Sequence, residues 1–194
     1  RSPQLSIWPI WVQRDCVRLN ALVCDLLEEG GFNPVSIPPS VTTVKSRPDI
    51  SDEGGFCLDV DVFKRYLESG FTPVSFGDVV PDESNVFSIL SGDDIMLKLA
   101  SSLNVSRAIF ASDVDGILDS WPEGELICSF THDMLDRFTD VETGRSDVTG
   151  AMKRKARLSL RIAEFCACGI VNGNKPGLLK RALFENCQGT WFQA

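Results

Sequence analysis

Residues 107–111 (RAIFA) form a short, nearly continuous apolar run that leads directly into the polar segment 112–116 (SDVDG). A run of this length and character is typical of a strand that is buried on both faces of a parallel sheet. Other strand-like runs alternate with helical patterns along the chain, and the connections between them are short. The sequence therefore predicts an α/β fold with an open, mainly parallel sheet sandwiched by helices.

The individual elements are predicted from apolar periodicity and from glycine and proline as stop signals. The expected strands cover residues 33–37, 73–76, 85–90, 107–111, 126–130, 169–171 and 190–193. The expected helices cover residues 12–28, 60–69, 93–103, 132–138, 150–166 and 176–184. Residues 41–58 are polar and rich in turn residues, and Gly54-Gly55 is expected at the tip of a hairpin or of a loop. In the first helix we expect a buried face made of Val12, Cys16, Leu19, Val23 and Leu26.

Length and composition narrow the class of protein. A chain of 194 residues predicts a single domain over residues 1–194. Its net charge of −8 makes nucleic acid an unfavourable partner, and no apolar run approaches the roughly 20 residues of a membrane span. Its seven cysteines are dispersed and odd in number, which fits free thiols in a reducing compartment. Because no signal-peptide pattern follows Arg1, we expect a cytoplasmic protein.

Polar loops follow four of the predicted strands, at the edge where parallel sheets bind ligands. They comprise residues 77–79 (GDV), 91–94 (SGDD), 112–116 (SDVDG) and 172–173 (NG). Each loop alone could be a solvated turn, but four at equivalent positions favour a binding edge. Ser91 is in addition a candidate N-cap of the helix that follows it.

A fifth segment, residues 147–150 (DVTG), leads into a helix that carries five cations within nine residues. These cations are Lys153, Arg154, Lys155, Arg157 and Arg161. Free amides at a helix N-terminus and nearby positive charge together favour a bound phosphate. The alternative is a solvated basic face of the helix.

Two other kinds of site find no support in the residues. The chain has no Gly-x-x-x-x-Gly-Lys-Ser/Thr loop, which excludes a P-loop enzyme. We name no metal ligand, because Cys166, Cys168 and Cys187 lack a fourth ligand at a sensible spacing.

Residues 108–118 (AIFASDVDGIL) resemble the first motif of haloacid-dehalogenase-type phosphatases, and residues 174–176 (NKP) resemble the lysine motif of that family. Members of that family place an acidic, metal-binding motif after the lysine. Only 18 residues follow Pro176, and they contain Glu185 but no aspartate. The order of the motifs therefore argues against a phosphatase.

An ordered set of segments along nearly the whole chain resembles the amino acid kinase superfamily and, within it, the isopentenyl phosphate kinases of archaeal type. The segments are PVSFGDVV (73–80), ILSGDDIMLKLA (89–100), AIFASDVDGIL (108–118), DVTGAMKRK (147–155), IVNGNKPG (170–177) and GTWF (189–192). SGDDI and DVTG-x-M-x-x-K are the specific motifs, because several branches of the superfamily share the DVDG loop.

This resemblance implies an enzyme that transfers the γ-phosphoryl group of ATP to isopentenyl phosphate, giving isopentenyl diphosphate and ADP for isoprenoid biosynthesis, with Mg²⁺ carried by ATP. Asp93 matches the aspartate that holds catalytic lysines in place, and Lys155 matches the lysine that reaches the ATP phosphates. Ser91 and Gly92 match the substrate-phosphate site. The implied nucleotide-binding residues are Ser112, Asp113, Asp115, Gly116, Gly150, Ala151 and Lys155.

Two parts of the family pattern are absent from the chain. Members begin with a Lys-x-Gly-Gly-Ser strand and loop, followed by a Gly-rich segment that ends in a substrate-binding His. Neither occurs here, and His132 lies far downstream. We therefore expect a chain that lacks the N-terminal strand and the Gly-rich loops and whose 194 residues alone are inactive.

Two alternatives to this function stay open. One is a fosfomycin-type kinase, or a kinase for another small phosphate or phosphonate. The other is a non-catalytic, nucleotide-binding member of the superfamily. The resemblance is also compatible with a homodimer.

Overall fold

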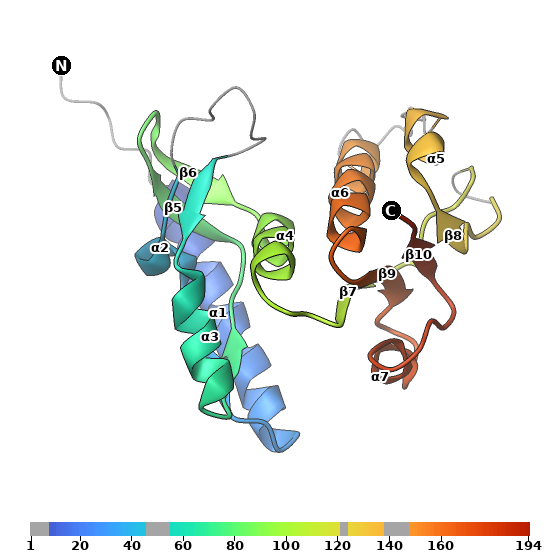
Figure 1. The fold of residues 1–194 in the computed structure, drawn as a ribbon. Coiled ribbons are helices and arrows are strands. Elements are labelled where there is room, and N and C mark those ends of the chain that lie inside the picture. The colour runs from blue at the N-terminus through green and yellow to red at the C-terminus, as the bar shows by residue number, and fades with distance from the viewer. Residues whose placement is uncertain (1–7, 46–54, 121–123, 138–147) are drawn as a thin grey trace. The chain divides into compact units, whose positions relative to one another are not determined.

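The computed structural model describes residues 8–45, 55–120, 124–137 and 148–194, and for residues 8, 136–137 and 148–151 only the backbone (Figure 1). The chain forms two compact units, Arg1–Ile95 and Met96–Ala194. The boundary between them falls inside helix α4 (Gly92–Ser102). The expectation of one domain over residues 1–194 stays a prediction, because compact units are defined by contacts and not by independent folding.

The first unit packs helices on small sheets. Its described helices are α1 (Trp8–Glu29), α2 (Pro39–Thr42), α3 (Val60–Glu68) and the start of α4. Its described strands are β1 (Pro34–Ser36), β2 (Thr43–Lys45), β3 (Phe56–Leu58), β4 (Thr72–Val74), β5 (Asp78–Asp82) and β6 (Val86–Leu90). Strands β3, β2, β5 and β6 form a mixed sheet in that order, and β1 pairs with β4 in parallel. Helix α1 packs against β1 and β5, and α3 packs against β4.

Of the two possibilities left open for residues 41–58, the described residues favour the hairpin, because strands β2 and β3 lie near the two ends of this segment. Strand β2 pairs antiparallel with β3, and the register joins Thr43 to Leu58 and Lys45 to Phe56. Thr43 and Leu58 are both buried, so this pairing also contributes to the core of the unit. Strands of three residues are too short to show a period of two, and a sequence pattern therefore misses them.

Helix α1 also differs from the prediction in the face that it buries. Of the expected face, Leu19 and Leu26 are 63% and 66% exposed, and Val23 is exposed as well. The inward face is centred instead on Asn20, whose Nδ2 donates to Ser36 Oγ of β1 at 2.6 Å. The apolar residues of α1 therefore lie largely outside the core of this unit.

The second unit contains residues 107–111, the apolar run that predicts a strand. Its described strands are β7 (Arg107–Ser112), β8 (Ser129–Phe130), β9 (Ala167–Asn172) and β10 (Thr190–Phe192), and its helices, besides the rest of α4, are α5 (His132–Arg137), α6 (Val148–Ala163) and α7 (Leu178–Ala182). The sheet order is β7-β9-β10-β8. Strands β7 and β9 run parallel from Arg107 opposite Ala167 to Ser112 opposite Asn172. Because the two strands end at the same level, the loops that leave them start side by side.

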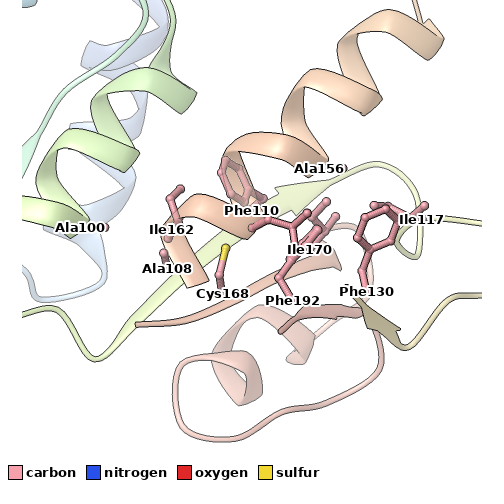
Figure 2. Packing of buried hydrophobic residues seen from close by; sticks show 11 residues of the cluster. Ala100, Ala108, Phe110, Ile117, Phe130, Ala156, Ile162, Cys168, Ile170 and Phe192 are labelled. Carbon is pink, nitrogen blue, oxygen red and sulfur yellow. The ribbon is translucent and has the colours of Figure 1, made fainter. Parts of the chain in front are cut away.

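One face of this sheet holds the larger core. Figure 2 shows Phe110 of β7, Ile170 of β9 and Phe192 of β10 gathered beneath α6, which contributes Ala156. Phe130 is fully buried, and its ring centroid lies 5.5 Å from that of Phe192. Burial of a large apolar side chain of this kind contributes about 1.5–3 kcal/mol.

The opposite face of the sheet packs against α7. Ile109, Val171 and Trp191 alternate with the residues of the first core and contact Leu178 and Ala182 of α7. The two helices therefore cover opposite faces of one sheet, which confirms the α/β fold with strands between layers of helices. The described pairs are mainly parallel: β1–β4, β2–β5, β7–β9 and β8–β10 are parallel, whereas β2–β3, β5–β6 and β9–β10 are antiparallel.

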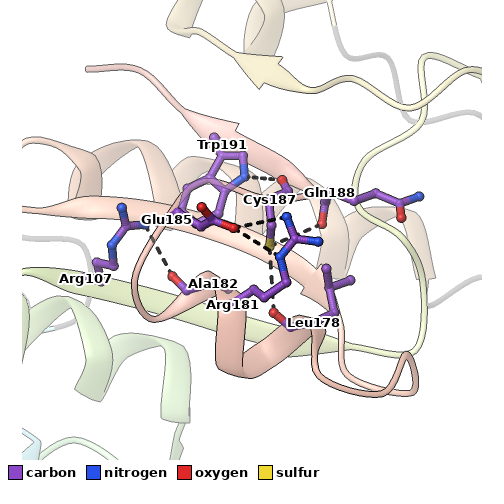
Figure 3. A network of polar contacts seen from close by, with 8 residues as sticks. All are labelled: Arg107, Leu178, Arg181, Ala182, Glu185, Cys187, Gln188 and Trp191. Atoms are coloured by element: carbon purple, nitrogen blue, oxygen red, sulfur yellow. Dashed lines mark hydrogen bonds and ion pairs between the residues drawn. The ribbon is translucent and has the colours of Figure 1, made fainter.

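Polar contacts attach the segment around α7 to the sheet (Figure 3). The indole Nε1 of Trp191 donates to the carbonyl of Cys187 at 2.8 Å. The guanidinium of Arg107 lies 5.4 Å from the Trp191 ring and donates to the carbonyl of Ala182 at 3.3 Å. These bonds connect the start of β7 with the segment that returns to β10.

Candidate functional site

The turn between β6 and α4 carries the first group of predicted site residues. Ser91 caps the helix as predicted, because its Oγ accepts the Asp93 amide at 3.2 Å and its carbonyl accepts the Ile95 amide at 3.2 Å. Gly92 and Asp93 form the first turn of α4 and are half-buried. The predicted group Ser91, Gly92 and Asp93 is therefore gathered at one helix N-terminus.

Gly77 lies against this turn and keeps it compact. A Cβ added to Gly77 would lie 3.3 Å from the Gly92 amide nitrogen and 3.3 Å from the Leu90 carbonyl oxygen. A side chain at that position would press on the backbone of the turn. Amides at a helix N-terminus attract an anion, whereas the Asp93 carboxylate at the same end would repel one. This combination suits a phosphate held by backbone groups and an aspartate that faces cations.

Asp78, which the sequence assigned to the same polar loop, has a different role. It opens strand β5 and is fully buried. Its Oδ2 accepts the Ser40 amide at 3.0 Å and its Oδ1 accepts the Val79 amide at 2.8 Å. The interpretation of residues 77–79 as a ligand-binding loop is therefore wrong for Asp78 and Val79, because two backbone amides satisfy this carboxylate inside the fold.

The second group of predicted residues follows β7 in the other unit. Ser112 ends the strand, and its carbonyl accepts the Gly173 amide at 2.8 Å from the loop after β9. The Ser112 hydroxyl donates to Asp113 Oδ1 at 3.3 Å. Asp113 is exposed, so its carboxylate and the adjoining amides lie at the rim of this edge. The two loops predicted to share an edge, 112–116 and 172–173, are therefore brought together.

Asp115 joins these two loops with both of its carboxylate oxygens. Asn172 Nδ2 donates to Oδ1 at 2.7 Å, and Lys175 Nζ donates to Oδ2 at 2.7 Å. The hydrogen bond from Lys175 is the main cause that holds the pKa of the Asp115 carboxyl below its usual value of 3.8, and the hydrogen bond from Asn172 is the second. Sequence reasoning did not assign Lys175 to this edge, although the Asn172-Gly173 loop after a predicted strand was a signal for it.

Gly116 closes the loop against strand β10. Its φ is +147°, and an added Cβ would lie 2.5 Å from Thr190 Oγ1 and 2.8 Å from Leu126 Cδ1. Thr190 is fully buried, and its Oγ1 accepts the Ile117 amide at 2.8 Å. Only glycine fits this conformation and this space, so Gly116 shapes the loop after β7.

Lys155 of α6 lies over the sheet in the same unit. Its Nζ is 4.4 Å from the centroid of the Phe110 ring, a cation–π distance. Phe110 and Ser112 are two residues apart on β7 and therefore share one face of the sheet. Lys155 thus lies on the face that Ser112 borders at the carboxyl end of the strand.

The rest of the predicted basic segment is described in part. Arg154 and Arg157 are exposed, whereas Lys153 and Arg161 are half-buried. The solvated-face alternative therefore holds for part of this helix. Gly150 and Ala151 belong to α6 by their backbone, but their side-chain environment lies outside the described residues, as does Asp147 altogether.

Other features of the described residues complete the survey. Among them there is no group of three or more His, Cys, Asp or Glu arranged to hold a metal ion. None of the described helices has the length and apolar character needed to cross a membrane. Each of the seven cysteines is a free thiol.

Comparisons of this chain with a family model, with curated proteins and with solved structures agree with one another. The sequence model of the amino acid kinase family matches residues 8–172. The isopentenyl phosphate kinase of Thermoplasma acidophilum is 32% identical over 178 residues, covering 91% of this chain and 68% of that protein. The isopentenyl phosphate kinase of Methanothermobacter thermautotrophicus is 34% identical over 192 residues, covering 93% of this chain and 67% of that protein. The chain thus spans about two thirds of the length of these relatives.

Solved structures agree with these matches. An isopentenyl phosphate kinase structure is similar with a TM-score of 0.71 at 30% identity, covering 91% of this chain and 66% of that one. The product complex of the Thermoplasma acidophilum enzyme is similar with a TM-score of 0.73 at 26% identity, covering 100% of this chain and 74% of that one.

Proposed function

The chain belongs to the amino acid kinase family and to its isopentenyl phosphate kinase branch, and we propose that it serves the transfer of the γ-phosphoryl group of ATP to isopentenyl phosphate. The products are isopentenyl diphosphate and ADP. The observation that carries this proposal is the identity of 32–34% to curated enzymes of that name across more than 90% of the chain. These relatives do not favour the fosfomycin-type alternative.

The group of residues proposed to bind the acceptor is the turn at the start of α4. A substrate phosphate is already ionised at neutral pH, so the reaction needs no general base. The Gly92 amide, at the positive end of the helix, is suited to hold that phosphate. Ser91 holds the turn by its capping bond of 3.2 Å. Asp93 then acts as a positioning residue that keeps cations near two anions that repel each other.

The group of residues proposed to bind the nucleotide is the edge formed by the loops after β7 and β9. Ser112 and Asp113 offer a hydroxyl, a carboxylate and backbone amides at this edge, and Asp115 and Gly116 keep the loop in shape. Lys155 supplies a positive charge for the ATP phosphates, and Gly150 and Ala151 supply backbone amides at the start of the same helix. Mg²⁺ bound to ATP adds positive charge between the phosphate groups.

The test is ADP release in the presence of Mg-ATP and isopentenyl phosphate, with fosfomycin and isopentenol as parallel acceptors. The assay compares the 194-residue chain with the protein from the complete reading frame that encodes it. We expect the protein from the complete reading frame to turn over isopentenyl phosphate and neither of the other acceptors, and the 194-residue chain to be inactive. Turnover with fosfomycin instead, or nucleotide binding without turnover of any acceptor, would refute this proposal and favour one of the two alternatives.

Two variants test the assigned roles. Lys155→Met removes a charge that stabilises the transferred group, and we expect kcat to fall by roughly 10²- to 10³-fold. Arg157→Met is the matched control, because Arg157 is exposed on the same helix. Asp93→Asn should lower kcat far more than it weakens ATP binding. An effect of Asp93→Asn confined to KM would contradict the positioning role.

We also propose that two copies of the protein associate through α1. Leu19, Leu22 and Leu26 of α1 are each at least 60% exposed and follow helical spacing along one face. An apolar stripe of this kind favours a protein partner. Leu22→Lys should shift a dimer to monomer in analytical ultracentrifugation, whereas Phe184→Lys, on a different exposed residue, should not.

The free thiols support the further proposal that the protein works in the reducing cytoplasm.

A further inference from the structure

We propose that Lys175 and Asn172 are positioning residues for the nucleotide, which act by clamping Asp115 and so keep the loop after β7 in its binding shape. This inference rests on the proposed function, since it concerns the edge proposed there to bind the nucleotide. Asn172 was predicted only as part of a polar loop at this edge, and Lys175 was not assigned to it; neither contacts the nucleotide in this proposal.

The loops that follow β7 and β9 are joined by several hydrogen bonds. The β7–β9 register ends with Ser112 opposite Asn172, and the Gly173 amide then donates to the Ser112 carbonyl at 2.8 Å. Asp115 reaches back across this junction and accepts one bond from Asn172 and one from Lys175, each 2.7 Å long. Both oxygens of the carboxylate are therefore engaged by the loop after β9.

The clamp on Asp115 is itself held in place. Asn172 Oδ1 accepts the Asn174 amide at 3.0 Å, so that both ends of the Asn172 amide group are used. The Lys175 amide donates to the Asn172 carbonyl at 3.3 Å, and the Lys175 carbonyl accepts the Leu178 amide at 3.2 Å. The lysine thus extends from a bonded turn that leads into α7, and its ammonium group has a defined direction.

Part of the loop after β7 is left for a ligand. Ser112 is tied to Gly173, Asp115 is tied to the clamp, and Gly116 packs on Thr190. Asp113, between these attachment points, is exposed. A rigid loop with its open segment at the rim presents hydroxyl, carboxylate and amide groups to a ligand without a cost of ordering them.

Lys175 and Asp115 also form an ion pair. The Lys175 and Asp115 side chains are 42% and 35% exposed, and a water-accessible ion pair of this kind adds little to global stability. Its two charges also offset one another, so Lys175 brings little net attraction for phosphate. The pair therefore fixes the shape of the loop after β7. We expect its loss to lower nucleotide affinity more than it lowers the free energy of unfolding.

The experiment measures the Kd of Mg-ADP by isothermal titration calorimetry for the parent, Lys175→Met, Asp115→Asn and the double variant. We expect each single change to raise Kd by roughly 10-fold, and the double change to add little more, because both remove the same clamp. Lys175→Arg retains a cation that can pair with Asp115 and should restore most of the affinity. Arg181→Met breaks the exposed Arg181–Glu185 pair of the same unit, and should leave Kd unchanged.

Several outcomes would overturn the proposal. If Asp115→Asn tightens binding while Lys175→Met weakens it, Lys175 is a direct ligand of the phosphates and not a clamp. If all variants retain the parental Kd, or if the parent binds no Mg-ADP, the positioning role is wrong. Because the readout is binding, it is separable from the proposed function: a protein that shows the expected pattern of Kd but turns over no isopentenyl phosphate refutes only the function.

Discussion

Gly116→Ala is the substitution for which the structure makes the sharpest quantitative prediction. The residue has φ of +147°, a conformation that side chains other than glycine rarely adopt, and such backbone strain costs about 1–3 kcal/mol. The added Cβ would also lie 2.5 Å from Thr190 Oγ1 and 3.0 Å from the Thr190 amide nitrogen. Overpacking of this kind costs about 1–3 kcal/mol, and the backbone atom cannot rotate away.

The two contributions add to a loss of about 2–6 kcal/mol in the free energy of unfolding. For a chain of this size the lower end of that range corresponds to a fall in Tm of at least about 4 °C. The Ile117 amide would in addition lose its bond to Thr190 if the threonine side chain rotated to relieve the contact. Destabilisation of this size is large for one methyl group, and it follows from where that group would lie.

Gly177→Ala provides the matched control in the same unit. Gly177 has φ of +75°, but nothing lies within 4 Å of an added Cβ, so only backbone strain of about 1–2 kcal/mol remains. Urea unfolding followed by circular dichroism, on the parent and both variants, measures the difference. Equal losses for the two variants would refute the reasoning, because the close packing on Thr190 would then contribute nothing.

Three further predictions follow from burial and charge. Phe130→Ala should cost about 3–5 kcal/mol in urea unfolding, because Phe130 is fully buried beside Phe192, and a loss below about 1 kcal/mol would contradict that packing. Burial raises the pKa of the Cys168 thiol to about 12, so a thiol reagent at pH 8 should modify exposed Cys57 and leave Cys168 unmodified until denaturant is added. The bonds from Lys175 and Asn172 lower the pKa of Asp115, so their contribution to stability is fully present above the usual carboxyl pKa of 3.8 and is lost as the pH falls through the lower folded-state value. The difference in Tm between the parent and Lys175→Met should therefore be small at neutral pH, because the pair is water-accessible, and should vanish below that pH; a difference that persists in acid would show that the ion pair is not its cause.

Much of the fold and part of the site could be predicted from the sequence because the signals are local. The apolar run of β7 predicts a buried strand, and Ser91 before an amphipathic segment predicts the start of α4. The bounds of several helices differ from the expected ones by one to four residues, since α1 begins at Trp8 and α6 ends at Ala163, which is the usual uncertainty of boundaries. The two groups of candidate residues at the ends of β6 and β7 could also be proposed from the sequence, since polar loops after strands are visible in it.

The tertiary structure decided what depends on residues far apart in the chain. The buried face of α1 is the one that reaches Ser36, and not the one with the most regular apolar spacing, because a helix buries the side that its neighbours contact. Asp78 is buried at the start of β5, and the fold accepts a buried carboxylate there because the amides of Ser40 and Val79 donate to it.

The loops after β7 and β9 likewise combine features that are read from the sequence with contacts that only the fold creates. The sequence by itself determined which residues carry charge, hydroxyl groups and glycine after β7, since those are chemical identities. That Lys175 is bonded to Asp115, 60 residues away, and that Thr190 limits Gly116 was decided only when the sheet brought β9 and β10 alongside β7. No local pattern encodes such contacts, because they depend on strand order and register, and these are set by the packing of the whole unit.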